Sequence, residues 1–177
     1  MDRCVALLRG INVGTKQRIA MADLRALFAG LGYTDVKTHL QSGNVVFGGA
    51  DGESEAAARV EAAIQRELGL TVRCLVRGRD ELAEVVERNP LGEVATDPAM
   101  HLVTFLSDRP DPARYADLDA AWYAPETYVV GEREIYVWCP DGVRNAKLIH
   151  SFWEKRLGLT ATARNWNTVT KLLAMLD

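Results

Sequence analysis

Hydrogen-bonding side chains are concentrated in RNWNT, residues 164–168, near the C-terminal end of the chain. An amphipathic helix is predicted to follow, so Asn165 or Asn167 can cap its first turn. A helix start also presents unpaired N–H groups and a partial positive charge, and an adjacent arginine adds a fork of donors that matches phosphate or carboxylate. We therefore expect an anion site here, with a purely structural helix start as the alternative. Its residues are Arg164, Asn165, Asn167, Thr168 and, one turn later, Lys171.

A second group of candidate residues lies in GINVGTK, residues 10–16. The segment is close to the phosphate-binding pattern GxxxxGKS/T, but it has one residue too few between its glycines, and Thr15 precedes the lysine. The next helix is predicted to begin several residues later, so its N-terminus would not point into the loop. These differences exclude a nucleoside triphosphatase of that class. The loop still offers Arg9, Asn12 and Lys16 to an anion, unless Asn12 only bonds the backbone of its own loop.

The turn QSGN, residues 41–44, supplies further polar groups. Ser42 invites comparison with a nucleophile, but it lacks the GxSxG elbow, and no histidine is placed by the sequence to activate it. A polar hairpin turn is therefore the favoured interpretation of Ser42. Gln41 and Asn44 could still contribute amide contacts to a neighbouring pocket.

Tyr136 and Trp138 are two residues apart on a predicted strand, so they share one face of it. Paired aromatic side chains on an open sheet can stack nucleic-acid bases. The glycine-aromatic signature of RNA-binding sheets is absent here, and packing in the core is the favoured explanation. The carboxylates in the middle of the chain have the spacing of solvated helix faces, so they indicate no acid–base pair.

The distribution of charge is compatible with an anion-binding surface. Residues 1–49 carry a net charge of +3 and residues 144–177 carry +4, whereas the whole chain carries −3, so the central part carries −10. If the two basic end segments meet in the fold, they form a positive surface that attracts anions. An ordinary solvated surface is the alternative interpretation.

The composition is typical of a globular protein that can bury a core, with 177 residues, 48% hydrophobic and 25% charged. No apolar run reaches the length of a membrane span or a signal-peptide core, so we expect a cytoplasmic protein without a membrane partner. Three cysteines without a CxxC pair argue against a disulfide framework. The three histidines are scattered, so no metal site is predicted, and no cofactor is predicted either.

Strands and helices follow the same order in both halves of the chain, which we predict as βαββαβ with a trailing helix. The letters LGLT occur at residues 68–71 and again at 157–160, where a helix ends before the last strand of each half. This order is that of the ferredoxin-like unit, an antiparallel sheet with its helices on one face. We therefore predict an α+β fold of two similar subdomains that arose by internal duplication. Their bounds are residues 1–90 and 100–177, with a linker at residues 88–99.

The first helix of each half is identified by its apolar spacing. In residues 21–31, Met, Leu and Phe side chains recur at the spacing of one helix face. Gly32, which follows them, is a residue at which a helix readily ends. In the second half, Asp111-Pro112 is a good cap and first position for a helix. That helix is predicted to carry Tyr115, Leu118 and Trp122 on its apolar face.

Several blocks of the sequence resemble the motifs of one family. They are LLRGINVG (residues 7–14), QSGNVVF (41–47), TARNWNTVTKL (162–172) and the further element YVWCPDG (136–142). The family is catalogued as domain of unknown function 1697, and the resemblance implies a bacterial-type α+β protein of two similar subdomains, without implying an activity. Two positions depart from the family pattern. Thr15 stands where the family usually has a second glycine, and Ala146 stands where it usually has a serine, so no hydroxyl role is carried over to that position.

The candidate residues together predict a binding protein for an anionic, phosphate-containing small molecule or a nucleotide, in a cleft between the subdomains. An enzyme that acts on a phosphate-containing substrate through Ser42 or a held water is one alternative, so enzymatic activity stays open. A nucleic-acid binder that uses the sheet face is the less favoured alternative. The sequence predicts no oligomeric state. The expected pocket consists of Arg9, Asn12, Asn44, Arg164, Asn165 and Asn167, with Lys16, Lys147 and Lys171 at its rim.

Overall fold

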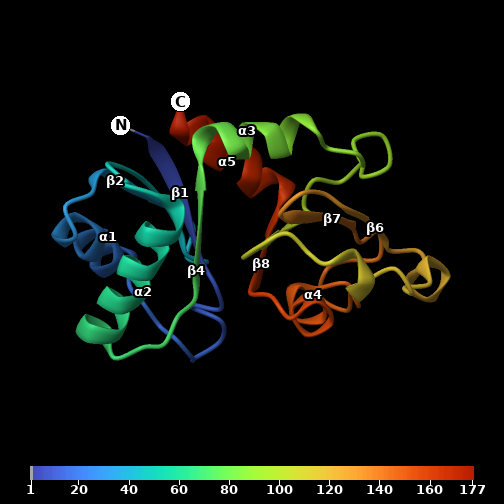
Figure 1. Ribbon diagram of the computed structural model, residues 1–177, viewed down its shortest axis with the longest axis horizontal. Coiled ribbons are helices and arrows are strands. Elements are labelled where there is room, and N and C mark those ends of the chain that lie inside the picture. Colours follow the sequence, from blue (N-terminus) through green and yellow to red (C-terminus); the bar gives the residue numbers. More distant parts are fainter. Residues whose placement is uncertain (1) are drawn as a thin grey trace. The chain divides into compact units, whose positions relative to one another are not determined.

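Two four-stranded antiparallel sheets form the framework of the fold, and each carries its own helices (Figure 1). The computed structural model describes residues 2–177. The chain divides into two units, of which the first runs up to Glu84 and also includes Leu172–Asp177, while the second is Val85–Lys171. The predicted α+β architecture of two similar subdomains is confirmed.

The first unit contains one sheet, two helices that cover it and the start of a third helix. Its central strand has five buried residues out of six, as expected for an apolar strand with neighbours on both sides. The elements in chain order are β1 (Arg3–Leu8), α1 (Met21–Gly30), β2 (Thr34–His39), β3 (Asn44–Gly48), α2 (Glu53–Leu68), β4 (Cys74–Gly78) and α3 (Arg79–Glu87). The strand order is β2-β3-β1-β4, so β1 pairs with both β3 and β4.

Helices α1 and α2 bury their apolar stripes against one face of this sheet. In α1 the buried residues are Leu24, Leu27 and Phe28, at the spacing of a single helix face. In α2, Val60 and Ile64 join the same core. The helix predicted over residues 21–31 is therefore confirmed.

The second unit repeats the sheet with fewer helical turns. Its elements are β5 (His101–Leu106), the 3-10 helices η1 (Pro112–Arg114) and η2 (Ala120–Tyr123), β6 (Thr127–Val130), β7 (Glu134–Trp138), α4 (His150–Leu157), β8 (Ala161–Asn165) and the first part of α5 (Trp166–Leu176), whose last residues belong to the first unit. The strand order is β6-β7-β5-β8, and all pairs are antiparallel. The central strand β5 thus takes the place that β1 has in the first unit.

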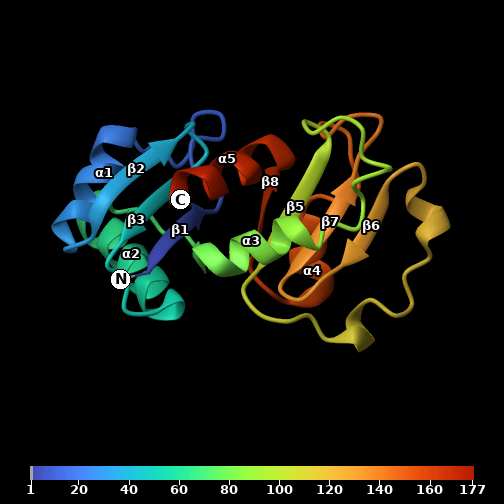
Figure 2. The same ribbon diagram turned by 90° about the horizontal axis from the view of Figure 1, so that it is seen from above.

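The helix predicted from Pro112 to Trp122 is wrong, because the chain forms only η1 and η2 there (Figure 2). The carboxylates of Asp111 and Asp119 each accept a hydrogen bond from the backbone N–H two residues later, both at 3.0 Å. An aspartate in the middle of a helical segment offers its backbone this competing bond. Trp122, which was expected on the apolar face, is 75% exposed.

Aromatic side chains build much of the core of the second unit. Trp153 on α4 is fully buried and packs edge-on against Tyr128 and Phe152, with ring centroids 5.1 and 4.9 Å apart. Phe152 in turn contacts Tyr123 at 5.4 Å. These rings cover the region beside α4 where the first unit has a complete helix.

The two LGLT segments end their helices in the same way. Gly69 and Gly158 both have a left-handed backbone with φ of +68°, the conformation that favours glycine at a helix end. The distance along the chain from LGLT to the last strand then differs between the units. In the first unit, the N–H of Arg9, directly after β1, donates to the carbonyl of Arg73. In the second unit, the N–H of Ser107, directly after β5, donates to the carbonyl of Thr160. The first unit therefore has two additional residues between LGLT and its last strand.

Candidate functional site

RNWNT spans the last two residues of β8 and the first three residues of α5, so it contains a helix start, as one of its two interpretations predicts. The side-chain oxygen of Asn165 accepts a hydrogen bond from the N–H of Thr168 at 2.9 Å, which is the bond of a helix N-cap. Trp166 stacks on His101, with ring centroids 4.7 Å apart and planes inclined by 10°. Asn167 is exposed. Asn165 and Thr168 thus serve the helix start itself.

Arg164, on strand β8, is buried, with only 7% of its surface exposed. Its Nη1 donates to the hydroxyl of Thr162 at 2.7 Å and to the carbonyl of Ala163 at 2.9 Å. The Nη1 group of Arg164 therefore bonds two neighbouring residues of its own strand. Lys171, one turn into α5, is exposed.

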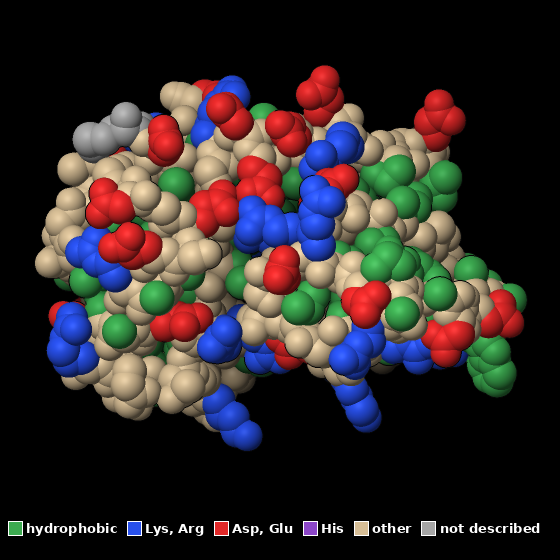
Figure 3. Space-filling model, viewed as in Figure 1, with side chains coloured by type: hydrophobic (Ala, Val, Ile, Leu, Met, Phe, Trp, Pro, Cys, Tyr) green, Lys and Arg blue, Asp and Glu red, His purple; other side chains and the backbone are tan. Residues whose placement is uncertain are grey.

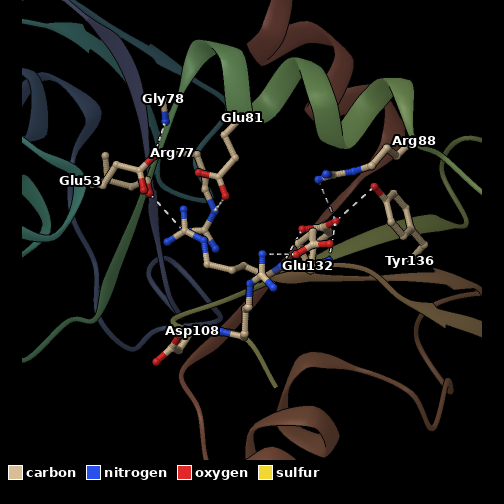
Figure 4. A network of polar contacts seen from close by, with 12 residues as sticks. Glu53, Arg77, Gly78, Glu81, Arg88, Asp108, Glu132 and Tyr136 are labelled. Atoms are coloured by element: carbon tan, nitrogen blue, oxygen red, sulfur yellow. Dashed lines mark hydrogen bonds and ion pairs between the residues drawn. The ribbon is translucent and has the colours of Figure 1, made fainter. Parts of the chain in front are cut away.

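A second buried arginine, Arg77, occupies the matching place in the first unit and was not predicted. It is 2% exposed, it pairs with the third residue of β1, and Arg164 pairs with the third residue of β5. Its Nε lies 3.5 Å from the carboxylate of Glu81, and Figure 4 shows these two side chains pointing toward each other. Beside them, Glu53 accepts a hydrogen bond from the N–H of Gly78 at 2.8 Å. A signal was present in the sequence, because each arginine stands two residues before a helix.

Each of the two sheets also has a buried polar side chain in its hairpin, at the same register position in both. This position lies opposite the fifth residue of the central strand. It is Asn44 in the first unit and Glu134 in the second. The carboxylate of Glu134 accepts hydrogen bonds from the N–H groups of Glu132 at 3.2 Å and Arg133 at 3.0 Å. Arg88 lies 3.5 Å from the same carboxylate. Sequence reasoning did not single out Glu134.

In the first unit, Asn12 joins its own loop to the hairpin turn between β2 and β3. Its side-chain amide donates to the carbonyls of Ile19 at 3.0 Å and Gln41 at 2.7 Å, and its oxygen accepts from the N–H of Ile19 at 2.9 Å. Asn12 also has φ of +54°, which asparagine tolerates better than most residues. Asn12 therefore has a structural role, and the segments GINVG and QSGN are in contact.

The polar residues of the QSGN turn bond one another. Asn44 is fully buried, and its amide donates to the carbonyl of His39 at 2.9 Å and to the hydroxyl of Ser42 at 3.0 Å. These bonds are typical of a polar hairpin turn, the favoured interpretation of Ser42. Gln41 is exposed at the tip of the turn.

Three loops at this end of the first sheet, of which the first and third carry basic residues, contain no carboxylate. They are residues 9–20, 40–43 and 69–73. The first and third are joined at the base, where the N–H of Arg9 donates to the carbonyl of Arg73 at 2.9 Å. We call these segments the basic loops, and Figure 3 shows Lys and Arg side chains projecting at this end of the first unit. Their cations are Arg9, Lys16, Arg18 and Arg73, and the guanidinium group of Arg73 lies 3.6 Å from the carboxylate of Glu61.

The opposite end of the same sheet is rich in acids. A hollow of about 440 Å³ lies there, lined by four carboxylate residues and two arginines. The two arginines are already paired, Arg3 with Asp35 at 3.7 Å and Arg79 with Asp177 at 2.6 Å. The carboxylate residues that line this hollow are Asp2, Glu53, Asp80 and Glu81.

Lys147 lies in a different part of the fold, within the second unit. Its backbone N–H donates to the carboxylate of Glu126 at 3.0 Å, as does the N–H of Leu148 at 2.9 Å. Its ammonium group reaches the carbonyl of Trp122 at 3.5 Å. These N–H groups before α4 are thus occupied by the chain's own carboxylate.

Tyr136 and Trp138 do not form an open pair of rings. Tyr136 is 2% exposed, and its hydroxyl donates to the carbonyl of Val85 at 2.7 Å, while Trp138 is half-buried. Burial raises the pKa of the Tyr136 hydroxyl well above its usual range. A platform that stacks two bases on this strand is therefore not formed.

Among residues 2–177, no group of three or more His, Cys, Asp and Glu side chains is placed to hold a metal ion. In the same part of the chain, no helix is both long and apolar enough to pass through a membrane. The three cysteines are buried and form no disulfide with one another, and burial raises the pKa of both Cys4 and Cys139 to about 11. These two thiols are therefore kept protonated at neutral pH.

His101 is expected to make the protein less stable in mild acid. It is 2% exposed, its Nε2 has no hydrogen-bond partner among the described residues, and burial lowers its pKa below the usual 6.5. Below about pH 6.5 the unfolded chain therefore binds a proton that the folded chain excludes, so stability falls as pH falls. The loss approaches about 1.4 kcal/mol for each unit by which the pKa is lowered.

Urea unfolding at pH 5, 6, 7 and 8 measures this effect. His101→Phe keeps a ring against Trp166 and should flatten the part of the stability curve below pH 7. Wild type and variant should run parallel between pH 7 and 8. An equally steep loss of stability below pH 7 in the variant would show that other groups cause it.

The fold and these loops define a two-unit α+β protein whose first sheet has a basic end. The chain belongs to the family described as Protein of unknown function (DUF1697), whose model matches residues 1–136. A solved structure, that of the conserved bacterial protein SP0830 from Streptococcus pneumoniae, has the same fold, with a TM-score of 0.79 and 23% identity over 99% of each chain. No match was found among curated proteins.

Proposed function

We propose that the protein binds a phosphate-containing anion at the basic loops of the first unit. The observation that carries this proposal is the absence of carboxylates from all three loops, which together hold four cationic side chains. A cluster of one sign of charge raises the local concentration of the opposite ion. The proposal retains Arg9, Lys16, Gln41 and Ser42 as binding residues.

The hydrogen bonds that hold these loops in place support anion binding, in addition to their positive charge. Asn12 fixes the first loop to the second, and the side-chain amide of Gln17 donates to the carbonyl of Thr71 in the third loop at 2.9 Å. The guanidinium group of Arg18 donates to the carbonyl of Gly14 at 3.1 Å. Cations held in place before binding lose less conformational entropy when the ligand arrives. Lys16 stands at the tip of the first loop, and its ammonium group bonds no other described residue.

Isothermal titration with inorganic pyrophosphate at low salt tests the proposal. The double variant Lys16→Gln with Arg18→Gln removes two positive charges from the basic loops and is expected to weaken binding roughly tenfold, the equivalent of about 1.4 kcal/mol. Lys37→Gln on strand β2 removes an exposed cation outside these loops and should change the affinity less than about twofold.

Two results would overturn the proposal. One is the absence of pyrophosphate binding by the wild-type protein at low salt. The other is equal affinity of the wild type and the double variant. Circular dichroism of each variant at the titration temperature confirms that the affinities refer to folded protein.

A further inference from the structure

We propose that the second unit has a ligand site of its own, which takes a mononucleotide or a compound that likewise combines a phosphate with a flat ring. The site is a hollow of about 570 Å³ between the segment after η1 and helix α4. This volume lies within the range of ordinary small-ligand sites. We call it the α4 hollow, and it is lined by Ala113, Arg114, Asp117, Phe152, Lys155 and Arg156.

The α4 hollow exists because the second unit lacks a counterpart of helix α1. In the first unit, α1 buries Leu24, Leu27 and Phe28 beside α2 and fills the corresponding space. In the second unit the segment between β5 and β6 forms only two short 3-10 helices, and Figure 2 shows its loose path around α4. One face of α4 is thus left without a helix against it. The residues of that face at positions i, i+3 and i+4 are Phe152, Lys155 and Arg156.

The hollow carries a positive charge that the chain does not neutralise. Arg156 forms an ion pair with Asp117, and its Nε donates to the carbonyl of Arg114 at 2.9 Å. This pair cancels one charge of each sign and ties the two walls together. Arg114 and Lys155 are exposed, and neither side chain has a hydrogen bond or ion pair with another described residue. Two free cations therefore face one hollow.

The helix end explains only part of this arrangement. Cations in the last turn of a helix are favoured by its partial negative charge, which accounts for Lys155 and Arg156. Arg114 comes from a different segment, and its Nη1 lies 4.0 Å from the position that a Cβ on Gly158 would occupy. Cations from two segments thus converge above an opening, as a phosphate group requires.

An aromatic wall distinguishes the α4 hollow from the basic loops. Phe152 is half-buried and held edge-on by Tyr123 at 5.4 Å and Trp153 at 4.9 Å, so its ring is fixed. A fixed ring can pack against a base while the cations hold a phosphate. The combination favours a nucleotide over inorganic phosphate.

Titration of the full chain with AMP, adenosine and inorganic phosphate tests this assignment, with backbone amide shifts recorded by NMR. AMP should bind at least about tenfold more tightly than either component alone, because it uses both the cations and the ring. The amides that shift should lie in residues 113–117 and 152–156. Equal affinity for inorganic phosphate and AMP would overturn the role of the ring.

Three variants identify the contacts. Arg114→Gln and Lys155→Gln should each weaken AMP binding about tenfold, and Phe152→Leu should weaken AMP binding while leaving phosphate binding unchanged. Lys171→Gln is the matched control for charge, because it removes an exposed lysine from α5, outside the hollow. Unchanged AMP affinity in Arg114→Gln and Lys155→Gln, or no AMP binding at all, would overturn the proposal.

The same titrations in the Lys16→Gln and Arg18→Gln double variant separate this site from the basic loops. AMP binding at the α4 hollow should persist there with its affinity unchanged. Loss of AMP binding in that variant would assign the nucleotide to the first unit instead, which contradicts the α4 hollow and supports the basic loops.

Discussion

Replacing Trp153 by alanine is expected to lower the free energy of unfolding by about 4 kcal/mol, a typical cost for emptying a buried aromatic site. Trp153 is fully buried and contacts the rings of Tyr128 and Phe152. The second unit has no counterpart of α1, so these rings supply much of the core that a helix supplies in the first unit. Urea unfolding followed by circular dichroism measures the change.

Two further variants make the result specific. Trp122→Ala is the same substitution at a side chain that is 75% exposed, and it should change the free energy of unfolding by less than about 0.5 kcal/mol. Trp153→Phe should cost less than half as much as Trp153→Ala, because it keeps most of the volume and the Nε1 of Trp153 has no partner to lose among the described residues. Equal losses at positions 122 and 153 would contradict the assignment of Trp153 to the core.

Replacing Asn12 is expected to cause the second-largest loss in the free energy of unfolding. The same replacement should also weaken the proposed anion binding. Asn12→Gly removes three hydrogen bonds and should cost about 2 kcal/mol. Asn12→Ala should cost about 1 kcal/mol more, because alanine is strained at φ of +54° and glycine is not. Both variants free the loop that carries Lys16, so pyrophosphate affinity should fall although no cation is removed.

The difference between the glycine and alanine variants isolates the strain of the left-handed backbone. Thermal and urea unfolding of both variants give that difference. Asn167→Ala is the control, because it replaces an exposed asparagine whose side chain bonds no other described residue. If Asn12→Gly were as stable as wild type, the three bonds of Asn12 would contribute nothing net to the fold.

Much of the fold could be predicted because its signals are local. The stripe in residues 21–31 and the glycine stops at Gly69 and Gly158 depend on neighbouring residues alone, and all three predictions are confirmed. The helix over residues 112–122 failed for a reason that is also local. Asp119 accepts a hydrogen bond from the backbone two residues later and so begins the separate 3-10 helix η2, although the apolar spacing indicates one continuous helix.

The sequence predicted which types of residue the candidate segments contain. It did not predict which of them would be buried or which hydrogen bonds they would form. The prediction that Asn165 or Asn167 caps this helix is confirmed at Asn165. The burial of Arg164 depends on which face of the sheet its strand presents, and the bond from Asn12 to Gln41 joins residues 29 apart. Contacts of that kind are set by the tertiary fold, which a spacing pattern does not contain. The α4 hollow arises because a predicted helix does not form. The sequence therefore did not indicate that the cations around it lie close together.

The opposite charges at the two ends of the first sheet give that unit a permanent electric dipole along its strands. A dipolar body turns in the field of a charged partner before the two surfaces touch. With the basic loops leading, an approaching polyanion would meet the binding surface more often than random orientation allows. Added salt shortens the range of this field to roughly 8 Å at physiological ionic strength. Salt should therefore slow association with an extended polyanion much more than it speeds dissociation, and the encounter rather than the bound state would be the step that ionic strength controls.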